Sequence, residues 1–566
     1  MALRSRTAAI RERLVPPGAA WLLASGALLG LAYPPFHLLL PSFIALVPYL
    51  VWVERLPGGR EGRAQARRGG FFLGWIYYTL VLYWLVTALI WYTWLAVLAF
   101  LATVAILAGI LAYTTLGLHL ARRRLGWPLW LVLPVFWTSN EWVRGHLPDV
   151  AFPWMQLGDT LTGFPWLVGA ADVVGSRGLS FWLCLSNGLL AVALLRWRAI
   201  GRPSAPGGRT AGGAWRPVLA FLLALALPAA YSLYRWNTLK LRPAARVAAI
   251  QPNVPEEMKF EREAATLGAI QATERLVESR LTGWQGSLDL LVLPETALPV
   301  HMEPIPSRGY PGRPQLMRWA ERLAWGLGAP VLFGGLGDED LGDGEYAYFN
   351  SAFLATPEGT AVRRYDKRRL VPVVERIPFL NPKWFSGIEY LGGFGVGQRA
   401  PLYAAGEGRF GVLICYESIY PGLAREYRRQ GANFLVNITN DAWFGRSHPW
   451  WSRTSALWQH PAHLVMRAVE TRTGIVRSAN TGISLFLDPL GRMRDATPLF
   501  TETAITGEVL TTEGRTLFVR FGDVLGWASI LAAAGAAGAL ARRRWRLRES
   551  AGERGRESGR PGTAAR

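Results

Sequence analysis

The sequence predicts a multi-span α-helical membrane domain of about eight helices, with an α/β domain inserted before the last helix. Three observations support this. Hydrophobic residues make up 51% of the 566 residues, and the mean hydropathy is +0.17, which favours a membrane protein. Apolar segments of about 20 residues, the length that crosses a bilayer as a helix, are concentrated in residues 1–235. Residues 236–522 instead contain short apolar runs separated by turn residues.

Eight segments are long and apolar enough to be candidate spans. They lie at 17–33, 36–53, 71–91, 94–120, 127–143, 177–195, 217–234 and 523–541. The first seven form the membrane domain, 1–235, and the eighth follows the α/β domain. The remaining tail, 542–566, is basic and poor in apolar residues, which predicts a disordered cytoplasmic segment.

The formal net charge of +21 comes almost entirely from segments beside the apolar spans. These basic segments are 1–15, 54–69, 122–124, 196–216 and 541–566. If the chain starts inside and alternates across the bilayer, all of them lie on the cytoplasmic side, as the positive-inside rule predicts. Both termini are then cytoplasmic and the α/β domain is not. A nucleic-acid-binding protein would place its basic residues on a folded face, so no nucleic-acid partner is expected.

Residues 236–522 contain seven apolar runs that end in polar residues. These are AARVAAIQPN, LDLLVLPET, APVLFGG, FNSAFLAT, RFGVLICYE, ANFLVNITND and TGIVRSAN. Such runs are typical of buried strands. Helix-compatible stretches such as 261–281 and 314–328 lie between them, and strands that alternate with helices indicate an α/β domain.

Three chemically active side chains follow predicted strands of this domain. Cys415 ends GVLIC, Glu295 follows LLVLP, and Lys367 follows AVRRYD. Ligands of α/β sheets bind at the carboxyl ends of strands. A carboxylate can accept a proton from an attacking thiol. A lysine can stabilise the oxyanion of an acyl carbonyl, together with the backbone N–H of Tyr416.

Each of these residues also has an ordinary structural explanation. A cysteine at a strand end can be a small buried hydrophobe. A glutamate after Pro294 can occupy a helix N-terminus, and Lys367 belongs to the charged run YDKRR, which suits a solvated surface.

Composition excludes some kinds of site. The chain has two cysteines, too few for a disulfide scaffold or a cysteine zinc cage. His448, His460 and His463 have no acidic partner at a spacing suited to metal binding, so surface or structural roles are favoured for them. No metal and no other cofactor is therefore expected.

The segments around the three active side chains resemble those of a known family. LPETA, YDKRRLVPVVERIPF and GVLICYES, in this order, resemble the segments of the nitrilase superfamily that carry its Glu-Lys-Cys triad. Other segments are similar to the apolipoprotein N-acyltransferase family, in which seven spans precede the nitrilase domain and one follows it. They are QPNVP at 251–255, NITNDAWFG at 437–445, MRAVETR at 466–472, RSANTGIS at 477–484, EWVRG at 141–145 and FPWMQLG at 152–158.

The resemblance implies a nitrilase-like αββα sandwich and a role for each matching residue. Cys415 would be the nucleophile, Glu295 the general base and Lys367 the cation that stabilises the oxyanion. Glu375, in VPVVERIPF, matches a second glutamate that helps to position the site. Tyr416 and Glu417 match positions that the family needs for activity.

The resemblance also implies substrate-binding positions. Trp443 matches an aromatic residue near the acyl entrance. Phe260 stands where the family often has a tryptophan, so the apolar plane is kept and the N–H donor is lost. Arg144, which the sequence places just outside a span, could contact a lipid head group or serve as an ordinary interfacial anchor.

The implied function is an acyl relay at the bacterial inner membrane, with the α/β domain on the periplasmic side. A membrane phospholipid donates an acyl chain to Cys415. The amine of the N-terminal S-diacylglyceryl cysteine of an apolipoprotein then accepts it, in the last step of lipoprotein maturation. The chain is expected to work in the bilayer as a monomer.

Two other interpretations remain open. A membrane-tethered amidase or nitrilase-type hydrolase would share the triad, but a tether needs only one span. A transporter or a non-catalytic membrane scaffold would not need an intact triad. A transporter would also show inverted repeats and interrupted spans.

Overall fold

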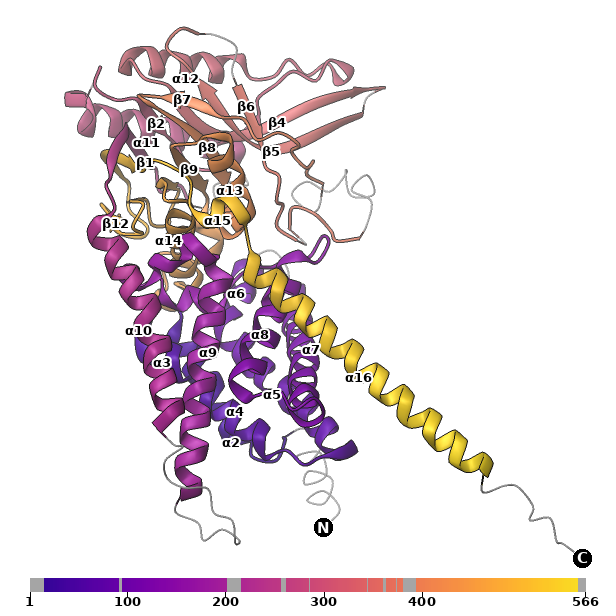
Figure 1. The fold of residues 1–566 in the computed structure, drawn as a ribbon. Coiled ribbons are helices and arrows are strands. Elements are labelled where there is room, and N and C mark those ends of the chain that lie inside the picture. Colours follow the sequence, from indigo (N-terminus) through magenta and orange to yellow (C-terminus); the bar gives the residue numbers. More distant parts are fainter. Residues whose placement is uncertain are drawn as a thin grey trace, which may run out of the picture.

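A helical bundle carries an α/β domain at one end in the computed structural model of the protein (Figure 1). The structure describes residues 15–557, apart from 91–93, 201–214, 256–260, 285, 344, 360–362, 373 and 380–392. The chain builds most of the bundle first and then the α/β domain, and it returns to the bundle through its last long helix.

The helices of the bundle differ widely in length. They are α2 (Ala19–Ala32), α3 (Leu39–Ile44), α4 (Val47–Arg55), α5 (Gly59–Leu82), α6 (Trp84–Ile90), α7 (Leu95–Arg124), α8 (Leu129–His146), α9 (Ala171–Ile200), α10 (Trp215–Thr238) and α16 (Val524–Glu557). Two short 3-10 helices, η1 (Leu157–Leu161) and η2 (Pro165–Ala170), lie between α8 and α9.

Several helices are suited to a membrane. Among the described residues, four are long and apolar enough to cross one, and α5 with α6 forms a further candidate that bends by 52°. The four candidates cover Leu95–Arg124, Pro165–Trp197, Trp215–Thr238 and Val524–Ser550. The chain therefore has a helical membrane domain, while the count of about eight spans stays a prediction.

The other expected spans form helices that are short or contain polar residues. Segment 36–53 divides into α3 and α4, and Pro48 lies at the start of α4, where a missing N–H is tolerated. Helix α2 has only 14 residues. Segment 127–143 becomes the 18-residue α8, which carries the buried Asn140, Glu141 and Arg144. These side chains face protein instead of lipid.

The basic segments 54–69 and 122–124 and the described start of 541–566 lie at the end of the bundle away from the α/β domain (Figure 1). Helix α7 ends in three arginines, and Arg122 pairs with Glu54 of α4 at 2.8 Å. Arg123 donates to the Glu54 carbonyl oxygen at 2.6 Å. Arg543 of α16 donates to the carbonyl oxygen of Arg124. These arginines, which form clusters along the sequence, therefore also lie together at one end of the folded bundle.

The α/β domain contains two sheets. One has the order β13-β1-β2-β4-β5-β6, with β3 paired to β4, and the other has the order β12-β11-β10-β9-β8-β7. The strands are β1 (Arg242–Gln251), β2 (Leu290–Val292), β3 (Leu298–His301), β4 (Val331–Gly342), β5 (Glu345–Ala355), β6 (Arg363–Asp366), β7 (Tyr403–Ala405), β8 (Gly408–Ile414), β9 (Phe434–Thr439), β10 (Gly474–Ala479), β11 (Leu485–Leu487), β12 (Met493–Arg494) and β13 (Thr503–Thr511). All seven apolar runs expected to be strands form strands, and the expected strand AVRRYD forms β6 within its described residues.

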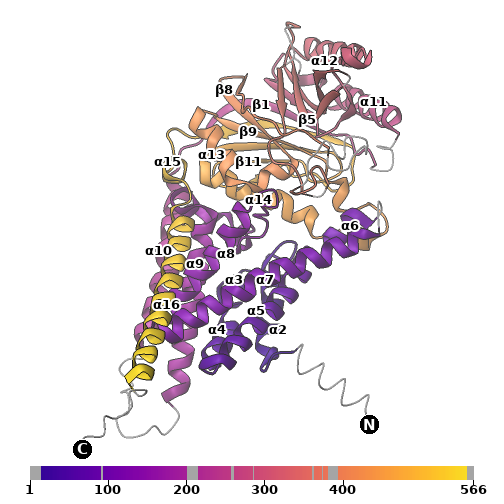
Figure 2. The same cartoon turned by 90° about the vertical axis from the view of Figure 1, so that its right-hand side faces the viewer.

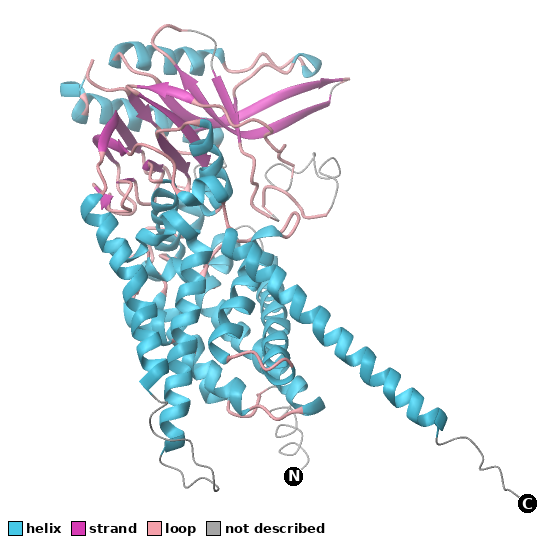
Figure 3. Ribbon diagram, in the orientation of Figure 1, coloured by secondary structure: helices cyan, strands magenta, loops and turns pink. Residues whose placement is uncertain are grey.

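Helices cover the outer faces of both sheets (Figures 2 and 3). Helices α11 (Arg262–Arg280) and α12 (Pro314–Leu327) pack on the first sheet, and α13 (Pro421–Gln430) and α14 (Ala456–Thr471) pack on the second. This arrangement is the expected αββα sandwich. Helix α14 also contacts α9 of the bundle, and nearly all of its residues are buried. A helix that is buried on all sides is covered by protein on every face. Helix α14 is covered by the sandwich and by the bundle, so it joins the two.

Buried charges fix this junction. Arg472, which caps α14, lies 2.9 Å from Asp172 at the start of α9, and the two residues are 2% and 3% exposed. Glu470 accepts the backbone N–H of Ser176 in α9 at 2.8 Å and pairs with Arg467 at 2.7 Å. Buried partners of this kind are costly to separate, so the two domains hold a fixed relation.

We expect Asp172→Ala to lower the thermal unfolding midpoint of the protein in detergent. The variant leaves Arg472 buried without its counter-charge, at a cost of about 3–5 kcal/mol. Intrinsic tryptophan fluorescence follows the transition. The control is Glu502→Gln, which breaks the exposed pair with Arg275, whose side chain is 58% exposed, and should leave the midpoint unchanged. Equal shifts in the two variants would contradict this role for Asp172.

Candidate active site

Cys415 follows β8 in a strained backbone conformation. Its φ of 49° is in the left-handed region, which is uncommon for a residue other than glycine and is enriched at functional sites. Strands β8, β9 and β10 are parallel neighbours, so Cys415, Asn440 and Asn480 follow their carboxyl ends at one edge of the sheet. The 3-10 helix η8 (Cys415–Ile419) then turns the chain away from this edge. Cys415 is 9% exposed.

Glu295, Lys367 and Glu375 converge in a buried cluster beside this edge. The Nζ atom of Lys367 lies 3.2 Å from Oε1 of Glu295 and 2.8 Å from Oε1 of Glu375. Asn350 of β5 donates to the same two oxygens, at 2.7 and 2.9 Å. The other oxygen of Glu295 accepts the backbone N–H of Asn440 at 2.9 Å. Two carboxylates thus share one ammonium and one amide away from water.

The charges of this cluster act on the Cys415 thiol. Burial raises the pKa of Cys415 and Glu295 raises it further, while Lys367 and a hydrogen bond from Thr439 offset only part of the rise. Burial by itself would lower the pKa of Lys367, but Glu295 and Glu375 outweigh burial and hold that pKa well above its usual value. The resting pair is therefore a neutral thiol and an ammonium. A neutral thiol needs a nearby base to accept its proton before it can act as a nucleophile.

Glu417 holds the backbone on both sides of the site. Its carboxylate accepts the N–H of Ile414 at 2.8 Å and the N–H of Arg368 at 2.6 Å. Burial raises the pKa of Glu417, and these hydrogen bonds lower it in part. The residue before Cys415 is in this way tied to the residue after Lys367. Glu417 positions the thiol and the ammonium through the backbone.

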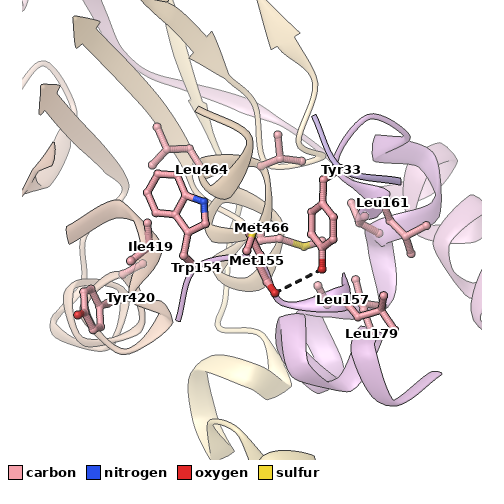
Figure 4. Close-up of a cluster of buried hydrophobic side chains, with 14 of the residues drawn as sticks. Tyr33, Trp154, Met155, Leu157, Leu161, Leu179, Ile419, Tyr420, Leu464 and Met466 are labelled. Atoms are coloured by element: carbon pink, nitrogen blue, oxygen red, sulfur yellow. Dashed lines mark hydrogen bonds between the residues drawn. The ribbon is translucent and has the colours of Figure 1, made fainter. Parts of the chain in front are cut away.

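Tyr416 connects the turn at Cys415 to the bundle. Its hydroxyl donates to the Ala151 carbonyl oxygen at 3.0 Å, and the Tyr420 hydroxyl donates to the same oxygen at 2.8 Å. The Tyr416 ring lies nearly parallel to Phe152, with 6.4 Å between ring centroids. Figure 4 shows Ile419, Tyr420 and Trp154 in one cluster of buried side chains, and Trp154 comes from the same loop as Ala151. The loop between α8 and η1 therefore underlies the turn at Cys415.

Arg144 lies inside α8 instead of just outside a span, and it is 2% exposed. Its guanidinium donates to the carbonyl oxygens of Trp154 and Met155 at 3.2 and 3.4 Å. Tyr33 donates to the Met155 oxygen as well, at 3.3 Å (Figure 4). The sequence placed Arg144 at a membrane surface because its partners in the loop could not be seen there. Arg144 supports the loop beneath the turn at Cys415.

The other predicted residues lie near the site or outside the described residues. Trp443 is half-buried in η9 (Asp441–Phe444), which follows β9 directly. Phe260 lies outside the described residues. Within the described part of the chain, no group of three or more His, Cys, Asp or Glu residues is arranged to hold a metal ion.

Two residues in the site were missed by the sequence analysis as contributors to it. One is Asn350, which lies in an ordinary strand segment and carries no local signal. The other is His460 of α14, for which the sequence favoured a surface or structural role without relating it to Cys415. Its Nε2 lies 3.1 Å from the Cys415 carbonyl oxygen, and its Nδ1 lies 2.9 Å from Asp441. A polar residue inside a fully buried helix needs partners, but the partner of His460 is known only from the fold.

Comparison with known proteins defines the class first. Residues 246–514 match the family described as carbon-nitrogen hydrolase, so the sandwich is a nitrilase-like hydrolase domain. Residues 25–189 match the apolipoprotein N-acyltransferase N-terminal domain. A CN-hydrolase superfamily protein from Xanthomonas campestris is 20% identical with a TM-score of 0.33, covering 47% of this chain and 90% of that chain.

Relatives extend over nearly the whole chain. An apolipoprotein N-acyltransferase of Geobacter metallireducens is 36% identical over 528 residues, which are 92% of this chain and 94% of that protein. One of Chlorobaculum tepidum is 30% identical over 544 residues, 90% of this chain and 95% of that protein. The chain belongs to the apolipoprotein N-acyltransferase family.

We expect Glu295→Gln to lower the pKa of the Cys415 thiol, because it removes a negative charge that disfavours the thiolate. Iodoacetamide alkylates the thiolate, so the curve of alkylation rate against pH should move to lower pH. Intact-protein mass spectrometry counts the adducts, and Cys415→Ala reports any reaction at Cys184.

The matched variant Lys367→Gln removes the positive charge that lowers the same pKa. Its alkylation curve should move to higher pH. Movement of both curves in one direction would show that these two charges do not control the thiol.

Proposed function

We propose that the chain is an N-acyltransferase that moves an acyl chain from a membrane phospholipid to an apolipoprotein. The acceptor is the amine of its N-terminal S-diacylglyceryl cysteine, and the reaction is the last step of lipoprotein maturation. The observation that carries this proposal is the convergence of Cys415 with Glu295, Lys367 and Glu375 at the junction with a membrane bundle. Membership of the family supports the acyltransferase activity.

In the first half-reaction the Cys415 sulfur attacks the ester carbonyl carbon of the phospholipid. Glu295 accepts the thiol proton as the new bond forms. Lys367 and the backbone N–H of Tyr416 stabilise the negative charge on the carbonyl oxygen. The ester C–O bond then breaks, the leaving oxygen takes the proton from Glu295, and a lysophospholipid departs. A thioester on Cys415 remains.

In the second half-reaction the acceptor amine attacks the thioester carbonyl. Glu295 accepts a proton from the nitrogen, the C–S bond breaks, and the proton returns to the sulfur. The product is an amide, and the thiol is restored. The site is buried, which keeps water from competing with the amine. The two steps form a ping-pong scheme in which every reacting group comes from the chain or its substrates.

Glu375 and Asn350 suit this scheme because Glu375 shares Lys367 and Asn350 as partners with Glu295. When Lys367 moves toward a developing oxyanion, Glu375 still compensates part of its charge, and Asn350 still donates to both carboxylates. The base therefore stays in place during each turnover. We assign Trp443 and Phe260 to the acyl entrance on the resemblance stated above.

We further propose about eight spans, in which the short α2, α3 with α4, and α8 cross within the bundle. Residues 1–235 and 523–541 then form the membrane part, and 236–522 the catalytic domain. The gathering of arginines at the end away from the sandwich supports cytoplasmic termini. It also supports a periplasmic catalytic domain at a bacterial inner membrane. No nucleic-acid partner or second subunit enters this scheme.

Incubation with phospholipid and no acceptor tests the function directly. Intact-protein mass spectrometry should show a gain of one acyl chain that hydroxylamine removes and that Cys415→Ala lacks. A diacylated lipopeptide should then discharge the adduct and become acylated. Release of free fatty acid without an adduct would indicate a hydrolase, and no reaction would indicate a scaffold or transporter.

We expect Asn350→Asp to slow thioester formation by about 100-fold or more, within the range of general-base contributions. The variant places a third carboxyl group beside Glu295 and Glu375, so the cluster retains a proton that the base must release. Rapid quenching and mass spectrometry measure the rate. Asn350→Ala removes the same hydrogen bonds without adding charge and should be less impaired. Equal losses in the two variants would contradict the electrostatic explanation.

A further inference from the structure

Two tryptophans project from a loop beside the active site. The loop, residues 446–453, joins η9 to α14 and contains the 3-10 helix η10 (Trp450–Ser452). Trp450 is 79% exposed and Trp451 is 62% exposed. A pair of tryptophans displayed in this way marks an interaction surface more often than it serves folding.

Hydrogen bonds close the base of this loop. The Ser452 hydroxyl lies within hydrogen-bond distance of the Arg446 carbonyl oxygen, at 3.1 Å. The Thr454 hydroxyl donates to the Phe444 carbonyl oxygen at 2.5 Å. A side chain at Gly445 would collide with the backbone of Ser452, at 2.5 Å. The two tryptophans are therefore presented by a closed and ordered loop.

The loop rests on the bend between two bundle helices. Tyr83 separates α5 from α6, and its hydroxyl accepts the backbone N–H of Ser455 at 3.0 Å. The Phe444 ring meets the Trp84 ring of α6 edge to face, with 5.2 Å between centroids. Figure 2 shows this part of the sandwich next to α6. The loop thus lies where the sandwich meets the bundle.

The adjoining bundle surface has the character of a surface that faces lipid. Helix α7 begins at Leu95 and is the most apolar candidate span among the described residues, with a mean hydropathy of 2.7. Trp94, Leu95 and Leu98, at its first turn, are 70%, 50% and 53% exposed. Helix α6 packs against α7, so the loop is continuous with the end of a membrane-facing surface.

The chemistry of the loop suits the boundary between lipid and water. Tryptophan is enriched there because its ring is apolar and its N–H can bind water or head groups. Arg446 and Arg453 flank the two tryptophans in sequence, and arginine pairs with phosphate. An exposed surface of aromatic and cationic side chains is complementary to phospholipid head groups. It is less complementary to the surface of a protein partner that lacks acidic side chains.

We propose that residues 446–453 form a membrane-docking loop. Trp450 and Trp451 insert among the phospholipid head groups of the leaflet beside α6 and hold the active-site side of the sandwich on the bilayer. The loop is directly connected to η9, where Asp441 binds His460, which in turn reaches the Cys415 carbonyl oxygen. Docking of this loop therefore holds in place a segment that is connected to the turn at Cys415. This inference needs only the membrane placement of the bundle and is independent of the proposed reaction.

Nitroxide depth measurements test the docking directly. Trp451→Cys is labelled in a background without Cys184 and Cys415, and the protein is placed in nanodiscs of phosphatidylethanolamine and phosphatidylglycerol. Collisions of the label with oxygen should exceed those with a water-soluble nickel complex. The control is Trp325→Cys on α12, where Trp325 is 77% exposed on the outer layer of the sandwich and should favour nickel. A label at 451 as accessible to nickel as the label at 325 would overturn the proposal.

Kinetics separate docking from a purely structural role. The double variant Trp450→Ala, Trp451→Ala should raise KM for a bilayer phospholipid about tenfold with a much smaller change in kcat, because uniform binding is lost. KM for a short-chain donor dissolved in water should rise less. Trp325→Ala should behave as the parent protein. An equal rise for both donors would overturn the proposal, and the depth measurement remains valid if no acyl transfer occurs.

Discussion

The buried ammonium of Lys367 forms ion pairs with two carboxylates at once, those of Glu295 and Glu375. Away from water an unpaired charge costs several kcal/mol, so Glu295 and Glu375 must both reach Lys367. The carboxyl ends of β2 and β6, which are parallel within one sheet, bring Glu295 and Lys367 to the same edge. Glu295 also accepts the backbone N–H of Asn440, which follows β9 of the other sheet. The charge cluster therefore joins the two halves of the sandwich as well as forming the site.

The turn at Cys415 is held from several sides. Glu417 ties the end of β8 to the residues after Lys367, and His460 reaches the carbonyl oxygen of Cys415 itself. Tyr416 fastens the same turn to the membrane bundle through Ala151. Because Cys415 has an unfavourable backbone conformation, such contacts are needed to maintain it. The turn is thus positioned jointly by the sandwich and the bundle, which suits a reaction between molecules anchored in a bilayer.

The same junction explains why hydropathy identifies only some of the bundle helices. Helices that face lipid must be apolar, and α7 has this character. Helix α8 instead faces protein and carries Glu141 and Arg144, whose partners lie in the loop beneath the active site. A buried polar side chain with good partners is tolerated inside a bundle, yet it lowers the hydropathy of the helix. Hydropathy therefore identifies the lipid-facing helices of this domain better than the helices in its interior.

Local pattern and charge in the sequence determined the α/β class of the second domain, its seven apolar strands and the distribution of arginines, while the family resemblance implied the αββα sandwich. These features depend on neighbouring residues, so they can be read directly. Glu295, Lys367 and Cys415 were singled out at strand ends, and a family resemblance supplied their roles. Only the tertiary structure decided that Asn350 bridges two carboxylates, that His460 lies beneath Cys415 and that Arg144 is buried. The physical reason is that a buried polar group is defined by its partners, and these lie outside the local sequence, from 10 residues away for Arg144 and Trp154 to 55 residues away for Asn350 and Glu295.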